Sequence, residues 1–458
     1  MYQINFQNPI HIYFIGIGGI SMSGLAEILL EKGFTISGSD SRESSLTQLL
    51  SQKGVNIHYG QIAENITQDI DLIVYTSAIH PDNPEYRAAI SLKIPLLTRA
   101  ELLGQIMKNY ELPIAVSGTH GKTTTTSMIS EILLAADADP TLSIGGILKT
   151  IGGNIRIGHS GCFVTEACEY TNSFLSFFPK IGIILNVEED HLDFFKDIND
   201  IRHSFHRFAA LIPDDGVLIV NGDIPELHTI TEGLSCQIVT YGKSAGCVYQ
   251  TTDISYRENG CADFTLIKNG RPDGTFSLST PGEHNVFNAL AAIALSDVLS
   301  IDRNIVHKAL LAFHGTDRRF EYKGQINGTT IIDDYAHHPT EITATLKAAA
   351  NYPHKTLWCV FQPHTFTRTK AFMKEFAQAL SHADQIILAD IYPARETDDL
   401  GISSRTLQKE IQSLGKTCYY FPDFEQIEKF ILDNCLPNDL LITMGAGDVV
   451  NIGEELLK

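Results

Sequence analysis

The sequence predicts an α/β protein of about three domains, because short apolar strands alternate with helices along most of its length. The chain has 458 residues, enough for about three domains of ordinary size. A strand, a glycine turn and a helix follow one another near residue 11 and again near residue 113, and a further strand–helix alternation begins near residue 319. Such alternation is typical of parallel sheets with right-handed crossovers. We expect domains over residues 1–110, 111–318 and 319–458.

Composition and charge narrow the classes of function. Of all residues, 43% are apolar and 19% are charged, as in globular proteins. The formal net charge is −20, from 34 basic and 54 acidic residues. This balance argues against nucleic acid as a partner, but not against an acidic nucleotide held by one loop. The eight cysteines form no Cys-x-x-Cys pair, so we expect reduced thiols rather than a disulfide frame or a zinc site.

The sequence gives no indication of export or membrane insertion. The first nine residues lack the basic start and apolar core of a signal peptide, and no apolar run approaches the ~20 residues that span a bilayer. We therefore expect a soluble, cytoplasmic protein without membrane contact. The sequence leaves open whether it is a monomer or a homodimer.

The first glycine turn predicts a nucleotide site. An apolar strand over 11–15 enters this turn, and a helix is expected from about 21 to 32. Gly16-x-Gly18-x-x-Ser21 matches the dinucleotide-binding fingerprint except that serine replaces the third glycine, so a nucleotide follows but NAD does not. A second strand, 35–39, ends at Asp40, which could bond a ribose hydroxyl, and a third, 71–75, stops before Ser77. The expected ligand contacts of this domain are Gly18, Gly19, Ser21, Asp40 and Ser77.

The second glycine turn predicts a phosphate-binding loop at Gly118–Thr123. It follows a short apolar strand and opens a helix expected over 122–135. Free backbone N–H groups and the positive end of the helix dipole attract phosphate at such a junction. Lys122 can reach the outer phosphates, and the hydroxyl of Thr123 suits Mg²⁺. The loop is shorter than G-x-x-x-x-G-K-[ST], whose first glycine would fall at Val116, and the competing interpretation is a tight turn with an incidental lysine.

Two residues beyond the loop are candidates for holding a metal ion. Glu166 follows a strand expected at 162–165, and His191 follows a strand expected at 181–186. Residues at the C-terminal ends of parallel strands converge on one crevice, where a metal ion would offset phosphate charge. Histidine is an unusual ligand for Mg²⁺, and either residue could instead be a solvated loop residue.

The remaining segments complete the alternation. Between residues 217 and 280 we expect shorter strands, with turn signals such as Asn269-Gly270. Helices are expected at 100–108, 198–211 and 283–299, and strands at 113–117, 331–334, 357–361, 385–389 and 439–444.

Further motifs run in a fixed order along the whole chain. They are Gly16-Ile-Gly-Gly-Ile-Ser-Met-Ser23, Gly118-Thr-His-Gly-Lys-Thr-Thr-Thr125, Glu166-Ala-Cys-Glu169, Glu189-Asp-His-Leu-Asp193, His284-Asn-Val-Phe-Asn288, Arg318-Arg-Phe320, Asp333-Asp-Tyr-Ala-His-His-Pro-Thr-Glu341 and Gln362-Pro-His-Thr-Phe-Thr-Arg-Thr369. Each motif alone is a modest signal. In this order and spacing they are highly specific, and the chain resembles the Mur ligases of peptidoglycan synthesis.

The resemblance implies a fold and a reaction. The fold would be a Rossmann-like N-terminal domain for a UDP sugar, a central P-loop-type ATPase domain of mixed α/β structure, and a Rossmann-like C-terminal domain for an amino acid. The reaction would be that of an ADP-forming ligase that joins UDP-N-acetylmuramate to L-alanine through an acyl phosphate, with ATP and Mg²⁺ as cofactors.

The resemblance also implies roles for single residues. The metal would be held by Thr123, Glu166 and His191, the amino acid would lie near His337, His364 and Arg368, and the catalytic groups would be Lys122, Arg319 and His337. The residues expected around ATP are Gly118, Thr119, His120, Gly121, Lys122, Thr123, Thr124, Asn285, Asn288, Arg319 and Asp334.

The sequence departs from the family pattern at three places. Cys168 stands where many members carry aspartate, and Thr365 stands where some carry an extra arginine. Several relatives use a carbamylated lysine about fifteen residues after the metal histidine, but residues 203–207 contain no lysine. We therefore expect no carbamate.

Three other functions remain as alternatives. One is a ligase that attaches recycled murein tripeptide to the same UDP sugar, although its glycine turn and third-domain motif differ from those here. Another is an NAD-dependent dehydrogenase, which only the first glycine turn suggests. The last is a non-catalytic nucleotide sensor, against which the intact Lys122, Glu166 and His191 argue.

Overall fold

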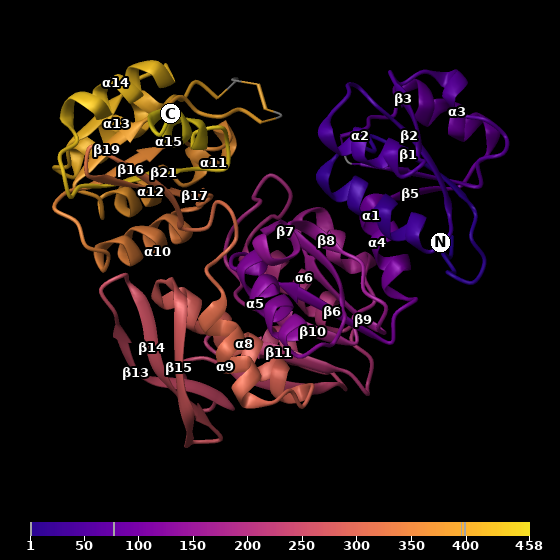
Figure 1. Cartoon of the computed structure of the whole chain (residues 1–458), viewed down its shortest axis with the longest axis horizontal. Coiled ribbons are helices and arrows are strands. Elements are labelled where there is room, and N and C mark those ends of the chain that lie inside the picture. Colours follow the sequence, from indigo (N-terminus) through magenta and orange to yellow (C-terminus); the bar gives the residue numbers. More distant parts are fainter. Residues whose placement is uncertain (1, 77, 395, 398–399) are drawn as a thin grey trace.

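Three sheets, one after another along the chain, organise the protein (Figure 1). The computed structural model describes residues 2–76, 78–394, 396–397 and 400–458. Helices flank each sheet, and most neighbouring strands are parallel. The α/β class, with a P-loop-type unit between two Rossmann-like units, is therefore confirmed. Ser77, one of the expected ligand contacts, lies outside the described residues.

The first sheet is parallel throughout, with the strand order β3-β2-β1-β4-β5. The order reverses between β1 and β4, and ligands of such sheets bind at this switch point, beyond the carboxyl ends of the strands. Its strands are β1 His11–Ile15, β2 Thr35–Asp40, β3 Asn56–Tyr59, β4 Leu72–Tyr75 and β5 Leu96–Thr98, and its helices are α1 Ile20–Glu31, α2 Ser45–Gln52, η1 Ala63–Asn65, α3 Pro84–Leu92 and α4 Arg99–Met107.

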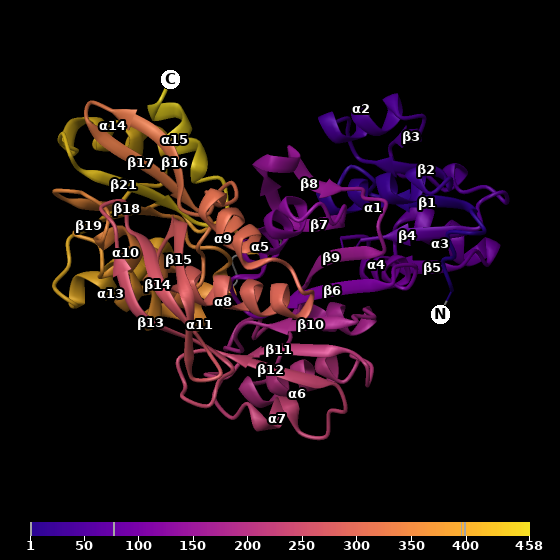
Figure 2. The ribbon, with the colours of Figure 1, turned by 60° about the horizontal axis from the view of Figure 1, so that its bottom comes forward.

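The second sheet has ten strands in the order β15-β14-β13-β12-β11-β10-β6-β9-β7-β8. In its parallel core β6 lies between β10 and β9, so the loops after these strands meet at one edge (Figure 2). The strands are β6 Leu112–Ser117, β7 Thr141–Leu148, β8 Gly153–Arg156, β9 Cys162–Ala167, β10 Ile181–Ile184, β11 Val217–Asn221, β12 Gln237–Tyr241, β13 Tyr249–Tyr256, β14 Cys261–Lys268 and β15 Arg271–Pro281. The helices are α5 Lys122–Ala135, η2 Lys149–Ile151, η3 Tyr170–Ser176, α6 Ile198–Ala209, α7 His228–Thr231, α8 Glu283–Val298 and α9 Arg303–Ala312.

The third sheet has the order β16-β17-β21-β18-β19-β20, and only its edge strand β16 is antiparallel to its neighbour. Its strands are β16 Glu321–Ile326, β17 Thr329–Asp334, β18 Leu357–Phe361, β19 Gln385–Leu388, β20 Cys418–Tyr420 and β21 Leu440–Met444. Its helices are α10 Pro339–Ala350, α11 Phe366–Ala371, α12 Met373–Leu380, α13 Ser404–Ser413, α14 Phe424–Asn434 and α15 Val450–Leu456.

Two strand ends differ from the prediction next to the site. β9 runs to Ala167, which pairs with Ser117 of β6, so Glu166 lies inside the strand and not just past it. β10 ends at Ile184, short of the predicted residue 186, because Asn186 bonds the glycine loop instead of a neighbouring strand. Both differences come from pairing with residues that are distant in sequence.

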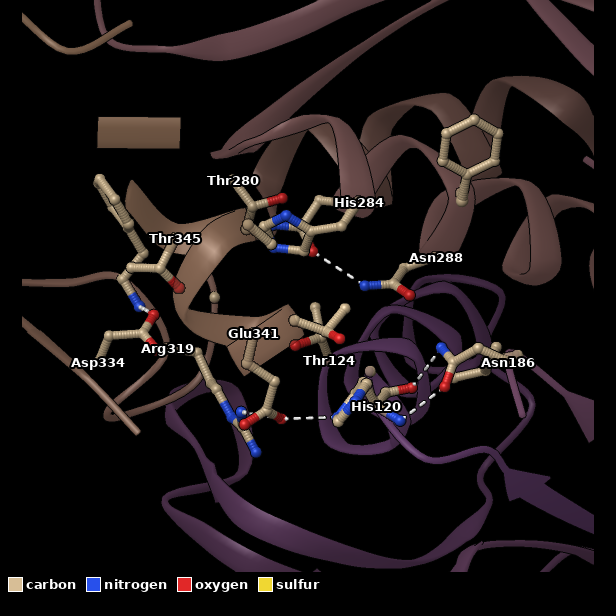
Figure 3. Close-up of a pocket in the computed structure, with 18 of the residues that line it drawn as sticks. His120, Thr124, Asn186, Thr280, His284, Asn288, Arg319, Asp334, Glu341 and Thr345 are labelled. Carbon is tan, nitrogen blue, oxygen red and sulfur yellow. Dashed lines mark hydrogen bonds and ion pairs between the residues drawn. The ribbon is translucent and has the colours of Figure 1, made fainter. Parts of the chain in front are cut away.

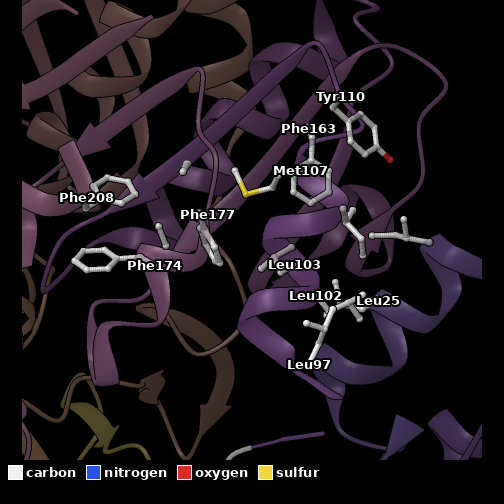
Figure 4. Close-up of a cluster of buried hydrophobic side chains, with 14 of the residues drawn as sticks. Leu25, Leu97, Leu102, Leu103, Met107, Tyr110, Phe163, Phe174, Phe177 and Phe208 are labelled. Atoms are coloured by element: carbon white, nitrogen blue, oxygen red, sulfur yellow. The ribbon is translucent and has the colours of Figure 1, made fainter. Parts of the chain in front are cut away.

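Apolar packing fastens the first unit to the second (Figure 4). Helices α1 and α4 share one buried cluster with Phe174, Phe177 and Phe208 of the second unit. A Cβ added to Gly104 of α4 would lie 1.9 Å from the carbonyl oxygen of Ser176, so this close approach requires glycine. The apolar clusters of the third sheet, by contrast, contain residues 320–457 alone. Polar contacts of the site described below join the third unit to the second.

Two further features concern the chain as a whole. The eight cysteines are free, and six of them are buried. In the part of the chain that the structure describes, we find no helix with both the length and the apolar character needed to cross a membrane.

Candidate active site

One asparagine side chain fixes the backbone of the glycine loop between β6 and α5. The Asn186 side chain accepts a hydrogen bond from His120 N at 2.7 Å and donates one to His120 O at 3.0 Å (Figure 3). Gly118 and Gly121 have φ values of +144° and +82°, which glycine adopts without strain. Gly121 caps the N-terminus of α5, so backbone N–H groups and the positive helix end face the space above the loop. The predicted phosphate site thus has the required backbone shape.

Lys122 is engaged by a buried carboxylate. Its Nζ donates to the carbonyl oxygens of Gly118 and Thr119 and lies 2.9 Å from Glu169 Oε2. Burial disfavours the ammonium, but the Glu169 carboxylate outweighs this effect and raises the Lys122 pKa above its usual value. Glu169 is only 2% exposed. Sequence reasoning placed Glu169 in a motif without giving it a role.

The predicted metal ligands converge at the ends of β6, β9 and β10. Thr123 Oγ1 donates to Glu166 Oε2 at 3.0 Å, and Gly145 N donates to Glu166 Oε1 at 2.5 Å. His191 Nε2 lies 3.9 Å from Glu169 Oε1, and the His191 ring stacks on Tyr170 with 4.4 Å between centroids. The structure therefore brings together all three residues expected to hold the metal.

The chemistry of this group suits a divalent cation. Burial raises the pKa of the Glu166 carboxyl and lowers the pKa of His191, which leaves a neutral imidazole able to act as a ligand. Glu169 Oε1 is buried and has no hydrogen-bond partner among the described residues. A cation between these groups would satisfy that oxygen and stabilise the Glu166 carboxylate. The residues present fit a bound metal ion.

A cavity of about 260 Å³ lies between the glycine loop, α8 and α10 (Figure 3). Asn288 donates to Asn285 Oδ1 at 3.0 Å on its α8 side, and Asn285 in turn donates to the Pro281 carbonyl at 2.8 Å. All the candidate ATP residues except Gly118, Thr119, Lys122 and Thr123 line this cavity, and they are His120, Gly121, Thr124, Asn285, Asn288, Arg319 and Asp334.

A smaller cavity of about 140 Å³ contains the groups expected to carry the chemistry. It is lined by Lys122 and Thr123 from the loop and by Arg319 and His337 from the third unit, together with His191. Burial lowers the pKa of His337 to about 4, so its imidazole is neutral near pH 7. Two cations, a neutral imidazole and a candidate metal ligand thus face one space.

Charged groups join α10 to the glycine loop. The His120 ring lies between two carboxylates, with Nδ1 3.3 Å from Glu341 Oε1 and Nε2 3.6 Å from Glu188 Oε2. Burial lowers the His120 pKa, but the adjacent carboxylates of Glu188 and Glu341 outweigh burial and raise it to about 9. The His338 ring packs against that of His120 at a tilt of 36°, with 4.6 Å between ring centroids. His120 therefore contacts the third unit as well as forming part of the loop.

Asp334 shapes the turn that carries the third-unit residues. Its Oδ2 accepts from Phe320 N at 2.8 Å and its Oδ1 accepts from Ala336 N at 2.7 Å. Burial raises the Asp334 pKa to about 6. Arg319 lies beside this turn, 3.8 Å from Glu341 Oε1. These bonds fix the positions of Arg319 and the segment before His337.

The three residues expected near the amino acid lie together. The rings of His337 and His364 are 5.7 Å apart between centroids, and Arg368 Nη1 contacts His364 Nδ1 at 3.2 Å. Arg368 Nη2 also lies 3.0 Å from Asp190 Oδ1. Burial raises the Asp190 pKa, but the Arg368 charge outweighs it and holds the pKa well below its usual range. Sequence reasoning did not give Asp190 a role.

The N-terminal candidates form a separate group at the carboxyl end of the first sheet. Gly18 N donates to Asp40 Oδ2 at 2.9 Å, so the Asp40 side chain braces the glycine turn. Gly19 caps α1, and Ser21 in its first turn accepts a hydrogen bond from Arg99. The structure brings these residues together at one turn. Arg99, which belongs to none of the sequence motifs, lies beside them.

The fold and the glycine loop define a P-loop-type ATP-using enzyme with two flanking Rossmann-like units. Three family models match it in order: the Mur ligase family, catalytic domain, over residues 11–111, the Mur ligase middle domain over 116–296, and the Mur ligase, glutamate ligase domain over 318–447. The chain belongs to the Mur ligase family.

Relatives and solved structures cover the full chain. UDP-N-acetylmuramate–L-alanine ligases of Lachnospira eligens and Agathobacter rectalis are each 60% identical to it, over 459 and 458 aligned residues, with 100% of both chains covered. The crystal structure of UDP-N-acetylmuramate-alanine ligase from Thermotoga maritima matches with a TM-score of 0.81 at 30% identity, covering 98% of each chain. That of a murein peptide ligase from Psychrobacter arcticus matches with a TM-score of 0.69 at 27% identity, again covering 98% of each.

Proposed function

We propose that this protein joins the carboxylate of UDP-N-acetylmuramate to the amine of L-alanine, with conversion of ATP to ADP and phosphate. The observation that carries the proposal is the small cavity where Lys122 and Thr123 of the loop face Arg319 and His337 of the third unit. The names of the 60% identical relatives support the choice of substrates.

The chemistry requires activation of the carboxylate, which is a poor acyl donor when ionised. A carboxylate oxygen attacks the γ-phosphorus of ATP, ADP leaves, and an acyl phosphate forms. The neutral amine of alanine then attacks the acyl carbon, the carbon–oxygen bond to phosphate breaks, and the amine loses a proton. Lys122 and Arg319 lie where their charges would stabilise the transferring phosphoryl group. His337, kept neutral by burial, is placed to accept the proton.

Mg²⁺ belongs to the proposal as the metal that Thr123, Glu166 and His191 would hold. When bound, it would offset negative charge on the phosphates of ATP. Thr123 lies in the first turn of α5, Glu166 lies within β9, and His191 follows β10. The sheet therefore fixes these three residues relative to the phosphate loop.

Further residues are assigned to the adenosine part of ATP, to alanine and to the UDP sugar. Asn285, Asn288 and Asp334 would contact the adenosine part of ATP in the larger cavity. Arg368 and His364 would bind the carboxylate of alanine, since an arginine fork matches a carboxylate in two hydrogen bonds. Gly18, Gly19, Ser21, Asp40 and Ser77 would hold the UDP sugar at the first sheet. We infer a monomer or a homodimer that works in the cytoplasm, where ATP and UDP sugars are available.

The recycling ligase is the second candidate, because a murein peptide ligase shares the fold. The alanine-adding enzyme is favoured, since its solved relative has the higher TM-score, 0.81 against 0.69. Neither the NAD-dependent dehydrogenase nor the nucleotide sensor has a counterpart among these relatives.

Selectivity for the amino acid tests the proposal. Phosphate release should need UDP-N-acetylmuramate and L-alanine together, with serine and glycine poor but real substitutes, because one methyl group is worth only about 1–3 kcal/mol. Valine, glutamate and D-alanine should be nearly silent, since each places atoms where a small pocket has no room. Rates are measured at saturating ATP and UDP sugar. Activity with murein tripeptide but not with alanine would select the recycling ligase, and equal rates with alanine and glutamate would contradict both assignments.

A further inference from the structure

Arg99 stands at the boundary between the first and second units. It is the first residue of α4, which begins with a capping box between Thr98 and Glu101. Its Nη1 donates to Ser21 Oγ, in the first turn of α1, at 3.1 Å. The N-termini of two helices therefore meet beside one guanidinium, and both helix ends carry partial positive charge.

This arginine has no negative partner in the described part of the chain. The Ser21 hydroxyl is its one hydrogen-bond acceptor among the described residues, and it forms no ion pair with any of their carboxylates. Burial lowers the pKa of Arg99, which means that the guanidinium is partly removed from water. A cation that is partly removed from water next to two positive helix ends is costly unless an anion approaches from outside the chain.

Arg99 lies between the expected UDP-sugar site and the segment that follows β9. On one side is Ser21, at the glycine turn expected to hold the UDP sugar. On the other is Cys168, in the segment after β9, which lies close enough to Arg99 and to Lys122 to interact electrostatically with both. Arg99 and the phosphate-loop lysine thus flank one segment of the second unit.

We propose that Arg99 binds an anionic group of the UDP sugar and so positions that substrate between the first and second units. This inference rests on the proposed function. The sugar nucleotide offers two oxyanions of the right chemistry, the diphosphate and the carboxylate, and a guanidinium can donate two parallel hydrogen bonds to either. The alternative is a purely structural role, in which Arg99 only links α4 to α1 through its hydrogen bond with Ser21.

Calorimetry on the full-length protein separates these possibilities. The ligands are UDP-N-acetylmuramate, UDP-N-acetylglucosamine, which has the diphosphate but no carboxylate, and UDP. The variants are Arg99→Ala and Arg99→Lys, which keeps the charge without the fork. Arg87→Ala on α3 is the control, because Arg87 is exposed and belongs to the same unit.

Arg99→Ala should raise the Kd for UDP-N-acetylmuramate about 10- to 100-fold, as expected for a charge-assisted hydrogen bond. The Kd of Arg99→Lys should lie between those of the wild type and Arg99→Ala. Arg87→Ala should leave the Kd unchanged, and the KM for ATP should not change. Equal weakening of all three ligands would assign Arg99 to the diphosphate, and weakening of UDP-N-acetylmuramate alone would assign it to the carboxylate. An unchanged Kd for every ligand in both Arg99 variants would overturn the inference. A wild-type protein that fails to bind UDP-N-acetylmuramate would instead refute the proposed function.

Discussion

Replacing Lys122 with methionine should lower kcat by at least about 10²-fold, because the variant loses a cation that stabilises the transferring phosphoryl group. The structure adds a second effect. Glu169 is buried and paired with Lys122, so the single substitution leaves an uncompensated buried carboxylate. Such a loss destabilises a protein by about 3–5 kcal/mol.

A second variant separates the two effects of Lys122. In Lys122→Met with Glu169→Gln, the buried charge is gone, so the melting temperature should return toward that of the wild type while ADP release stays low. Thermal unfolding and ADP release are measured on both variants. Near-normal turnover in the double variant would mean that the loop is a turn with an incidental lysine.

The metal assignment predicts the second large effect. Glu166→Gln and His191→Ala should each raise the Mg²⁺ concentration for half-maximal activity by at least about tenfold, since even residues behind metal ligands have effects of that size. Glu166 accepts hydrogen bonds from Thr123 and Gly145, and it belongs with His191 to the set of candidate metal ligands. Both substitutions therefore act on one site. The measurement is a Mg²⁺ titration of phosphate release at fixed ATP.

Glu131→Gln is the matched control for this titration, because Glu131 lies far along α5 and bonds Thr150 instead of the loop. Its Mg²⁺ curve should overlay that of the wild type. If the curves of Glu166→Gln and His191→Ala overlay it as well, the two residues do not hold the metal.

The elements that carry the site were predictable because their signals are local. A strand, glycines, a lysine and a threonine in one short run specify the loop and the start of α5, and the observed helix, Lys122–Ala135, has the predicted limits. The same holds for Asn285 and Asn288, which share a helix face and do lie side by side.

The partners of these residues were not predictable from local patterns. Asn186 contacts His120 across 66 residues and Asp190 contacts Arg368 across 178, and neither pairing follows until the strand order and the position of the third unit are known. Glu169 and Arg99 were missed for a related reason. Each is an ordinary charged residue in the sequence, and only the structure reveals that Glu169 is buried against Lys122 and that Arg99 lacks a carboxylate among the described residues.

The central claim is that the carboxylate of the UDP sugar is phosphorylated before the amide forms, and isotope transfer tests it most directly. UDP-N-acetylmuramate labelled with ¹⁸O in its carboxylate is incubated with ATP, Mg²⁺, L-alanine and the enzyme, and the released phosphate is analysed by mass spectrometry. The acyl phosphate route predicts one ¹⁸O atom in each phosphate formed, because the carbon–oxygen bond breaks when the amine attacks. Amide formation with unlabelled phosphate would contradict the account.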